Sequence, residues 1–465
     1  MRPLDTLIIC RMASGRLVSG SHRPLGPVSI DTRTLASGDA FFCIRGPRFD
    51  GHSFVQQAIE KGARVIVGEP KGVARFSDGC LGADVAIITV PDTVRALGRV
   101  ALAARARFPG PVVGLTGSSG KTTTKDFIAA VLATAGPTLA TRGNLNNHLG
   151  VPLTLLRISA EHEFAVVEMG MNAPGEIAYL TEITRPNVGV ITSVGAAHLE
   201  GLGSVEAVAR AKGELMGALA SGGVAIIPSD VPHSWILTGG LRAPLLTVGE
   251  RPADDVRLVR GREAAGGAAG VIETDGDRYP LQLRLAGRHN LHNALLAVAV
   301  GHLLGVSPDA AVAAIEGVDP PRLRGELRRL PDGGEVMLDC YNANPQSMAA
   351  ALQTFSDRAP GGLLILGDML ELGTGAAEAH AELGRVVAAL PGDPVFIGVG
   401  PLCRHAVEAA RAAGMPADRA VSVPRSMDAA GVVAERRQGG RPMLLKGSRG
   451  MALERIYEAL AGEGS

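Results

Sequence analysis

The chain of 465 residues has no excess of either charge, since 46 Lys and Arg balance 46 Asp and Glu. Proteins that bind nucleic acid usually carry a basic face, so we expect no nucleic-acid partner. No apolar run approaches the roughly 20 residues that a membrane helix needs, and the early run "LIIC" is too short for a secretion signal. The sequence therefore predicts a soluble, cytoplasmic protein with no membrane insertion.

Aromatic residues and cysteines are also scarce. Aromatics make up only 3% of the chain, while its hydrophobic content of 46% is mostly Ala, Val and Leu, which is typical of α/β cores and argues against disorder. The five cysteines form no Cys-x-x-Cys pair and are scattered along the chain. We expect reduced and mostly buried thiols, as in a cytosolic protein, at Cys10, Cys43, Cys80, Cys340 and Cys403.

The length allows two to four domains, and the pattern of apolar runs along the chain predicts three. Residues 1–108 mix short strands and helices and predict a small α/β domain. Residues 109–320 contain continuous apolar runs such as "FAVVEMG" and "NVGVITSV", which indicate a mostly parallel sheet of the P-loop type, with alternating antiparallel strands over 256–286. Residues 321–465 alternate strand and helix again, which predicts a Rossmann-like domain. Pro and Gly near positions 110 and 320 are plausible hinges.

The stretch "GLTGSSGKTTTKD", residues 114–126, lies between a buried strand and a helix predicted from Lys121 to Ala135. A glycine-rich turn in this place directs backbone N–H groups and a helix N-terminus at an anion. Lys121 is then expected to reach the β- and γ-phosphates of a nucleotide, and the Thr122 hydroxyl to ligate Mg²⁺. The spacing is unusual, because only two residues separate Gly117 from Gly120.

Three further positions and one stretch are candidates whose role the residues alone leave open. Glu168 ends a strand, where a carboxylate can hold a metal or simply face solvent. His198 and Lys212 follow the next buried strand, as site residues or as an ordinary structural histidine and a solvated lysine. The asparagine-rich stretch "GNLNNHLG" is either a loop or a polar lid over a substrate.

Taken together, these motifs resemble the Mur ligase family of peptidoglycan synthesis, whose short phosphate loop has the pattern of "TGSSGKTT". The resemblance extends in order from residue 29 to residue 449. Its segments are most similar to those of the family member that adds D-alanyl-D-alanine to a UDP-N-acetylmuramoyl-tripeptide. They are "SIDTR", "FCIRGPRFDGHSF", "GNLNNHLGVPLTLLR", "AHLEGLGSVEAVARAKGEL", "GRHNLHNALLA", "YNANPQSM", "LGDMLELG" and "LLKGSR".

The resemblance implies a role for each matching residue. Lys121, Lys212 and His198 would be catalytic. The ATP phosphates would be bound by Gly117, Ser118, Ser119, Gly120, Lys121, Thr122 and Thr123, and the rest of the nucleotide by Asn290, Asn293, Arg322 and Asp339. Two Mg²⁺ ions would be held by Thr122, Glu168, His198 and Lys212, the last as a carbamylated lysine. The UDP-muramoyl substrate would be bound by Asp31, Thr32, Arg33, Asn144 and Asn147.

Three segments depart from the pattern of that member. Leu338 stands where a second acid is common before Asp339, Pro321 replaces a glycine before Arg322, and "MNAPGEI" lacks a histidine that some members carry. None of these changes removes an expected phosphate or metal ligand.

The implied activity is ATP-dependent amide formation through an acyl phosphate, by a protein expected to be a monomer. The alternatives are another ligase of the superfamily, such as a folylpolyglutamate synthase or a different Mur step, and a regulatory ATPase without ligase activity. A purely structural α/β protein would leave the phosphate loop unexplained. The sequence does not distinguish meso-diaminopimelate from lysine as the third residue of the tripeptide.

Overall fold

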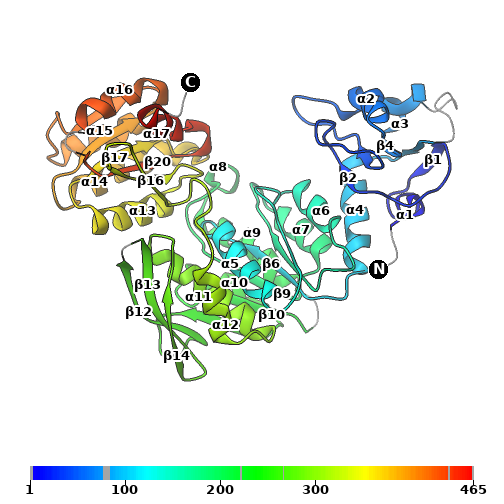
Figure 1. Cartoon of the computed structure of the whole chain (residues 1–465), viewed down its shortest axis with the longest axis horizontal. Helices are drawn as coiled ribbons and strands as arrows, with labels where there is room; N and C mark the ends of the chain where they lie inside the picture. The colour runs from blue at the N-terminus through cyan, green and yellow to red at the C-terminus, as the bar shows by residue number, and fades with distance from the viewer. Residues whose placement is uncertain (1–3, 77–83, 220–221, 265, 438–439, 463–465) are drawn as a thin grey trace.

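The computed structural model describes residues 4–76, 84–219, 222–264, 266–437 and 440–462, so Cys80 lies outside the described residues. Three sheets follow one another along the chain, each with its own helices (Figure 1). The predicted three-part α/β architecture is confirmed, and within the described ranges no helix is both long and apolar enough to cross a bilayer.

The first sheet has five strands in the order β1-β5-β4-β3-β2, all parallel except β1. Within the segment "PVSIDTR", Val28 and Ser29 pair in this sheet, and the helical segment "HSFVQQAIE" begins with a 3₁₀ turn, η1. The strands are β1 (Arg16–Ser19), β2 (Val28–Ser29), β3 (Ala40–Phe42), β4 (Val65–Gly68) and β5 (Ala86–Thr89), and the helices are α1 (Thr6–Met12), η1 (Gly51–Phe54), α2 (Val55–Glu60), α3 (Pro70–Val73), η2 (Ala74–Phe76) and α4 (Thr93–Ala106).

The second sheet has nine strands in the order β14-β13-β12-β11-β10-β9-β6-β8-β7. It is parallel from β7 to β12 and ends in the predicted antiparallel edge, β12–β14. The strands are β6 (Val112–Thr116), β7 (Thr138–Ala140), β8 (Phe164–Glu168), β9 (Val188–Ile191), β10 (Val224–Pro228), β11 (Leu245–Gly249), β12 (Val256–Ala264), β13 (Gly267–Thr274) and β14 (Asp277–Gln282). The helices are α5 (Lys121–Ala133), α6 (Gly150–Leu155), α7 (Glu176–Thr184), α8 (Leu199–Leu202), α9 (Val205–Gly217), α10 (Ser234–Thr238), α11 (Arg288–Leu303) and α12 (Pro308–Glu316).

Both faces of this central sheet are buried, which explains its continuous apolar strands. Val113 and Leu115 of β6 pack in one core with α5, α11 and α12, whereas Val112 packs in the opposite core with α6, α7 and α9. Neighbouring residues of a strand point to opposite faces, so a strand covered on both sides must be apolar throughout.

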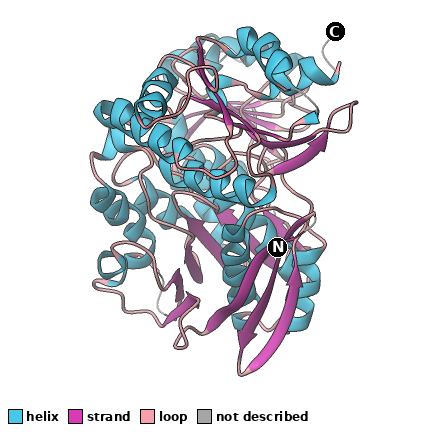
Figure 2. Cartoon of the chain, turned by 90° about the vertical axis from the view of Figure 1, so that its left-hand side faces the viewer, coloured by secondary structure: helices cyan, strands magenta, loops and turns pink. Residues whose placement is uncertain are grey.

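The third sheet has the order β15-β16-β20-β17-β18-β19 and is parallel except for β15. Helices lie on both sides of its strands (Figure 2), as predicted for a Rossmann-like domain. The strands are β15 (Glu326–Arg329), β16 (Glu335–Asp339), β17 (Leu363–Gly367), β18 (Val395–Val399), β19 (Ala420–Val423) and β20 (Met443–Lys446), and the helices are α13 (Pro345–Arg358), η3 (Gly373–Gly375), α14 (Ala376–Ala388), α15 (Cys403–Ala412), α16 (Ser426–Arg436), η5 (Arg449–Met451) and α17 (Glu454–Ala461).

Contacts join the three sheets in chain order. Helix α4 packs against α1 of the N-terminal part and against α6 and α7 of the central part. On the other side, α8 of the central part contacts η3 of the C-terminal part. The N-terminal and C-terminal sheets lie on opposite sides of the central one (Figure 1).

Candidate active site

A cavity of about 900 Å³ lies between the central and C-terminal sheets. The carboxyl ends of β6 and β8 open into it from one side, and β16 and β20 contribute Asp339 and Lys446 from the other. Ligands of open α/β sheets bind at this end of the strands, so the cavity is the candidate site.

The glycine-rich loop forms the wall at the end of β6. Gly120 has φ +79° and is followed directly by helix α5, and a side chain here would collide with Asn293. Lys121 extends its Nζ atom back over the loop and donates a hydrogen bond to the Gly117 carbonyl at 2.6 Å. The loop thus has the curled shape that surrounds an anion at a helix N-terminus.

Ser118 and Ser119 fasten this loop to the segment after β9. The Ser118 hydroxyl donates to the Gly195 carbonyl at 3.1 Å, and the Ser119 N–H donates to the Ser193 hydroxyl at 2.8 Å. Both serines line the cavity together with Gly120 and the three residues that follow, whereas Gly117 lies behind the lining. These bonds to the segment after the neighbouring strand β9 fix the loop before any ligand arrives.

Glu168 faces this loop at the end of β8 and is only 2% exposed. Its Oε2 accepts a hydrogen bond from the Thr122 hydroxyl at 3.0 Å, and its Oε1 accepts one from the Asn146 amide at 2.8 Å. The predicted pair of oxygen ligands, Thr122 and Glu168, is therefore adjacent in space. A buried carboxylate beside a hydroxyl provides the hard oxygen donors that Mg²⁺ prefers.

The asparagine-rich stretch forms part of the cavity wall, and its asparagine side chains have different partners. Asn144, Asn146 and Asn147 all line the cavity. The Asn147 side chain, however, accepts hydrogen bonds from the Leu149 and Gly150 N–H groups at 3.1 and 2.9 Å, which stabilises the start of α6. Asn146, which the sequence did not single out, is the residue that contacts Glu168.

Lys212 lies on α9, is 1% exposed, and does not line the cavity directly. No hydrogen bond or ion pair engages its ammonium among the residues that the structure describes. Burial lowers the pKa of Lys212 well below its ordinary value, and the positive charge of Lys121 lowers it further. The sequence could not show this, because a helical lysine is usually solvated.

The pKa of Lys121 is lowered less strongly than that of Lys212. The surrounding protein lowers its pKa by desolvation, while the Glu168 carboxylate raises it and the Arg324 guanidinium lowers it again. The phosphate-loop lysine, the strand-end acid and a cation of the C-terminal part therefore act on the same region of the cavity.

His198 stands at the start of α8 with φ +56° and lines the cavity. Its Nδ1 lies 2.9 Å from Oε2 of Glu371, a residue of the C-terminal part that the sequence analysis did not single out. The close contact with the His198 ring lowers the pKa of the Glu371 carboxyl group. His198 thus lines the cavity and also contacts the C-terminal part of the chain.

Asn290 and Asn293 project from α11 toward the glycine-rich loop and are 5% and 6% exposed. The Asn293 amide donates to Asn290 Oδ1 at 3.0 Å, and its own Oδ1 accepts from the Thr124 hydroxyl at 3.2 Å. Both line the cavity, and this chain of bonds joins α11 to α5. Their contact with adenine stays a prediction.

The C-terminal wall contains two basic residues, Lys446 and Arg324, for which no role was predicted. Lys446, 1% exposed, donates to Asp339 Oδ2 at 2.6 Å and to the Asn342 carbonyl at 3.1 Å. The Arg324 guanidinium lies 3.9 Å from the centre of the Tyr341 ring. Both line the cavity, as does the predicted Asp339.

Arg322, which was predicted to contact the nucleotide, is not among the residues that line the cavity. Its side chain is 79% exposed and lies 4.0 Å from Glu458. Its contact with the nucleotide stays a prediction. The segment "PPRLRG" contains two arginines two positions apart, and its sequence gives no signal that Arg324 is the one facing inward.

The three N-terminal candidates lie outside this cavity, on the first sheet. Asp31 accepts hydrogen bonds from Arg33, which lower the pKa of the Asp31 carboxyl group, and Thr32 donates to Gln57 at 2.7 Å. They form a separate polar group just after β2, so the structure does not bring them together with the phosphate loop.

The fold and the cavity define a nucleotide-binding protein of the P-loop class with three α/β parts. Models of the Mur ligase family match each part: the family's catalytic domain over residues 26–105, its middle domain over 115–301 and its glutamate ligase domain over 323–449. A Bacillus subtilis protein named UDP-N-acetylmuramoyl-tripeptide–D-alanyl-D-alanine ligase is 36% identical over 97% of each chain. The chain belongs to the Mur ligase family.

Solved structures agree with this assignment. A crystal structure of MurF from Acinetobacter baumannii is 31% identical, with a TM-score of 0.88 over 99% of each chain. MurF ligase from Thermotoga maritima, crystallised in complex with ADP, is 26% identical, with a TM-score of 0.80 over 94% of this chain and 97% of that one.

Proposed function

We propose that the protein is an ATP-dependent ligase that joins D-alanyl-D-alanine to UDP-N-acetylmuramoyl-tripeptide. The names of its full-length relatives support this, because they describe that reaction. The observation that carries the proposal is the cavity itself, in which Lys121, Thr122 and Glu168 face the C-terminal wall. A carboxylate to be activated and an amine to be added can meet there.

Lys121 and the loop N–H groups stabilise the transferring phosphoryl group. Two anions, a carboxylate and a triphosphate, must approach one another, and fixed positive charge offsets their repulsion. The loop is held by Ser118 and Ser119 in advance, so little reorganisation is needed when the charge develops.

The side chains around Glu168 fit the magnesium ions that the family implies. The Thr122 hydroxyl is adjacent to the buried Glu168 carboxylate, and His198 adds a nitrogen donor to the lining of the same cavity. We propose that these residues hold Mg²⁺, two ions in all, which supply charge neutralisation for phosphoryl transfer.

Lys212 is proposed to carry a carbamate. An ammonium cannot ligate a cation, whereas carbamate oxygens resemble a carboxylate. Carbamylation requires the neutral amine, and the lowered pKa of Lys212 favours that form. A negative carbamate would also give this buried position the anionic character that a metal requires.

The proposed reaction has two steps, formation of an acyl phosphate and formation of the amide. A carboxylate oxygen of the tripeptide attacks the γ-phosphorus, the bond to the β-phosphate oxygen breaks, and ADP leaves an acyl phosphate. The amine of D-alanyl-D-alanine attacks the acyl carbon, loses a proton, and phosphate departs with the original carboxylate oxygen. Water must be excluded between the steps, because the acyl phosphate would otherwise hydrolyse. The cavity between two sheets provides that enclosure.

The proposal is tested by crossing UDP-muramoyl-tripeptides with candidate amines and measuring phosphate release. We expect release to require both the UDP-substrate and D-alanyl-D-alanine, and to fall about 10²–10³-fold in the Lys121→Ala control. Release with a single amino acid would indicate a different ligase of the superfamily. Release that no UDP-muramoyl peptide changes would indicate a regulatory ATPase.

A further inference from the structure

Glu371 belongs to the C-terminal part but reaches into the site of the central part. It lies between β17 and η3, and its carboxylate is 2.9 Å from Nδ1 of His198. Its carbonyl also accepts a hydrogen bond from the Glu200 N–H at 3.3 Å. Glu371 thus contacts the central part through both its side chain and its backbone.

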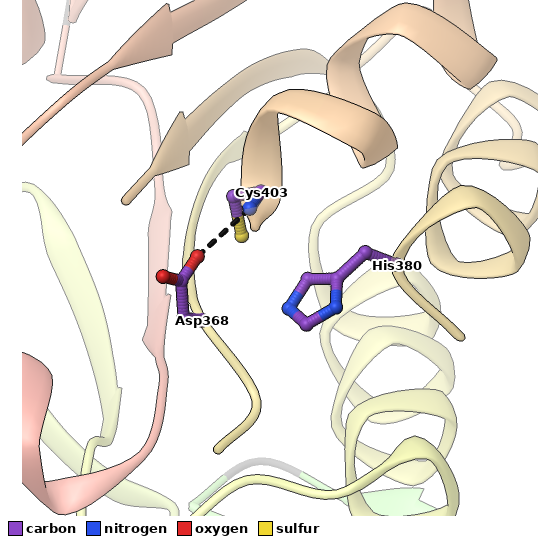
Figure 3. Close-up of side chains that lie close together, drawn as sticks. All are labelled: Asp368, His380 and Cys403. Atoms are coloured by element: carbon purple, nitrogen blue, oxygen red, sulfur yellow. Dashed lines mark hydrogen bonds between the residues drawn. The ribbon is translucent and has the colours of Figure 1, made fainter. Parts of the chain in front are cut away.

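The loop that carries Glu371 is firmly held. Asp368 Oδ1 accepts a hydrogen bond from the Cys403 N–H at 2.8 Å (Figure 3). His380 Nε2 accepts one from the Met369 N–H at 3.0 Å, and the Leu370 N–H donates to the Ser448 hydroxyl at 2.9 Å. Since the His380 Nδ1 lies 2.6 Å from the Ala376 carbonyl, both ring nitrogens are engaged. The group Asp368, His380 and Cys403 therefore fixes a loop and has no free ligand atom on His380 for a metal.

Glu371 itself has φ +65°, a left-handed conformation that costs a non-glycine residue free energy. The bonds on either side of it hold the backbone in this shape. Close approach at Gly373, where a Cβ would lie 3.1 Å from Glu200 Cα, keeps the loop against α8. The carboxylate is therefore directed at His198 by the fold of the C-terminal part.

The contact decides which nitrogen of His198 is free. Nδ1 is shielded from solvent and lies 2.9 Å from the Glu371 carboxylate, in an ion-pair contact whose angle is not that of a hydrogen bond. The negative charge of Glu371 favours a proton on this nitrogen. Nε2 then remains available as a ligand on the cavity wall. Histidines that ligate metals usually give their other ring proton to a carboxylate or carbonyl, which fixes the tautomer and the ring orientation.

We propose that Glu371 is a positioning residue for His198, so that docking of the C-terminal sheet completes the metal site of the central part. The inference rests on the proposed function, because it takes His198 as a ligand. It adds a consequence: metal affinity depends on a residue from another part of the chain. The enzyme then holds its metal most tightly when the C-terminal wall of the cavity is in place.

The test is Mn²⁺ binding to the ADP-loaded full chain, followed by the electron paramagnetic resonance signal of free Mn²⁺. We expect Glu371→Gln to weaken Mn²⁺ binding about tenfold, the lower end for loss of such a partner, since the Glu371 side chain is 59% exposed. Glu200→Gln is the matched control, because it removes an equal charge from the same junction without contacting the histidine ring, and its affinity should stay within about twofold.

A double-mutant cycle separates positioning from a general structural effect. In a His198→Ala background, Glu371→Gln should change Mn²⁺ affinity by less than about twofold. Equal weakening in both backgrounds, or unchanged affinity of Glu371→Gln alone, would overturn the inference while leaving the ligase proposal intact. Absence of any Mn²⁺ binding by the ADP-loaded wild type would contradict the metal assignment as well, and phosphate release under crossed substrates would then decide the ligase proposal separately.

Discussion

At the scale of single residues, Lys212 is the most informative position. It is almost fully buried with a strongly lowered pKa, an arrangement that a protein does not keep for stability. Its folded-state pKa lies below that of the unfolded chain, so the folded state holds the proton less tightly. The stability penalty is therefore absent above the unfolded pKa near 10.5 and grows as the pH falls.

We predict that Lys212→Met stabilises the protein at pH 7 in CO₂-free buffer by about 3 kcal/mol, since folding no longer forces a lysine to lose its proton or to be buried with its charge, and a similar volume remains. The gain should shrink as the pH approaches 10. Urea unfolding followed by the fluorescence of the single tryptophan, Trp235 on α10, measures it, because α10 packs against α9. A gain that does not change with pH would show that the lysine charge is not its source.

The carbamate at Lys212 has its own test. Lys212→Ala should lose most activity and regain part of it when a small carboxylate such as acetate fills the vacated space. Chloride at equal ionic strength is the control and should restore nothing. Full activity of Lys212→Ala in CO₂-free buffer would exclude the carbamate.

At the scale of elements, Arg105 ties the N-terminal part to the central one. It comes from the end of α4, is 9% exposed, and donates at 2.9 Å each to the carbonyls of Thr184, Arg185 and Phe108. The carbonyls of Thr184 and Arg185 lie at the C-terminal end of α7, where carbonyl groups lack hydrogen-bond donors within the helix. A single guanidinium therefore caps one helix from the end of another.

We predict that Arg105→Ala destabilises the protein by about 3 kcal/mol, because buried carbonyls lose charged donors. Amide hydrogen exchange over α7 should quicken, and the thermal midpoint should fall. Arg95→Ala is the control, since Arg95 lies on the same helix with 78% of its side chain exposed. Equal effects of the two substitutions would remove the special role of Arg105.

The elements also show how far the sequence alone could lead. The central sheet was predictable because strands covered on both faces are continuously apolar. The strand-to-helix turn was predictable from its glycine-rich sequence. Which arginine of "PPRLRG" faces inward was not, because Leu323 turns the backbone with φ +62°. Glu371 was equally hidden, since its importance arises only when η3 meets α8 across the molecule.

At the scale of the whole molecule, the three parts must admit two substrates and then exclude water. The sequence predicts hinges near 110 and 320, and the structure distinguishes their surroundings. Helix α4 and Arg105 hold the first junction, whereas the segment between α12 and β15 is an irregular connection with Pro320 and Pro321. We expect most of the motion at the second.

Small-angle scattering should therefore show a smaller radius of gyration when ADP and the UDP-muramoyl substrate are both bound than in the free protein. ADP alone is the control and should produce only part of the change. Superimposable profiles in all three states would contradict closure.

We propose that this chain transfers the γ-phosphate of ATP to the tripeptide carboxylate and then forms an amide with D-alanyl-D-alanine. A tripeptide with two ¹⁸O atoms in its terminal carboxylate tests this directly, with phosphate and product examined by mass spectrometry. We expect one ¹⁸O in the released phosphate and one in a UDP-muramoyl-pentapeptide. Phosphate without label, or label appearing in AMP, would contradict it.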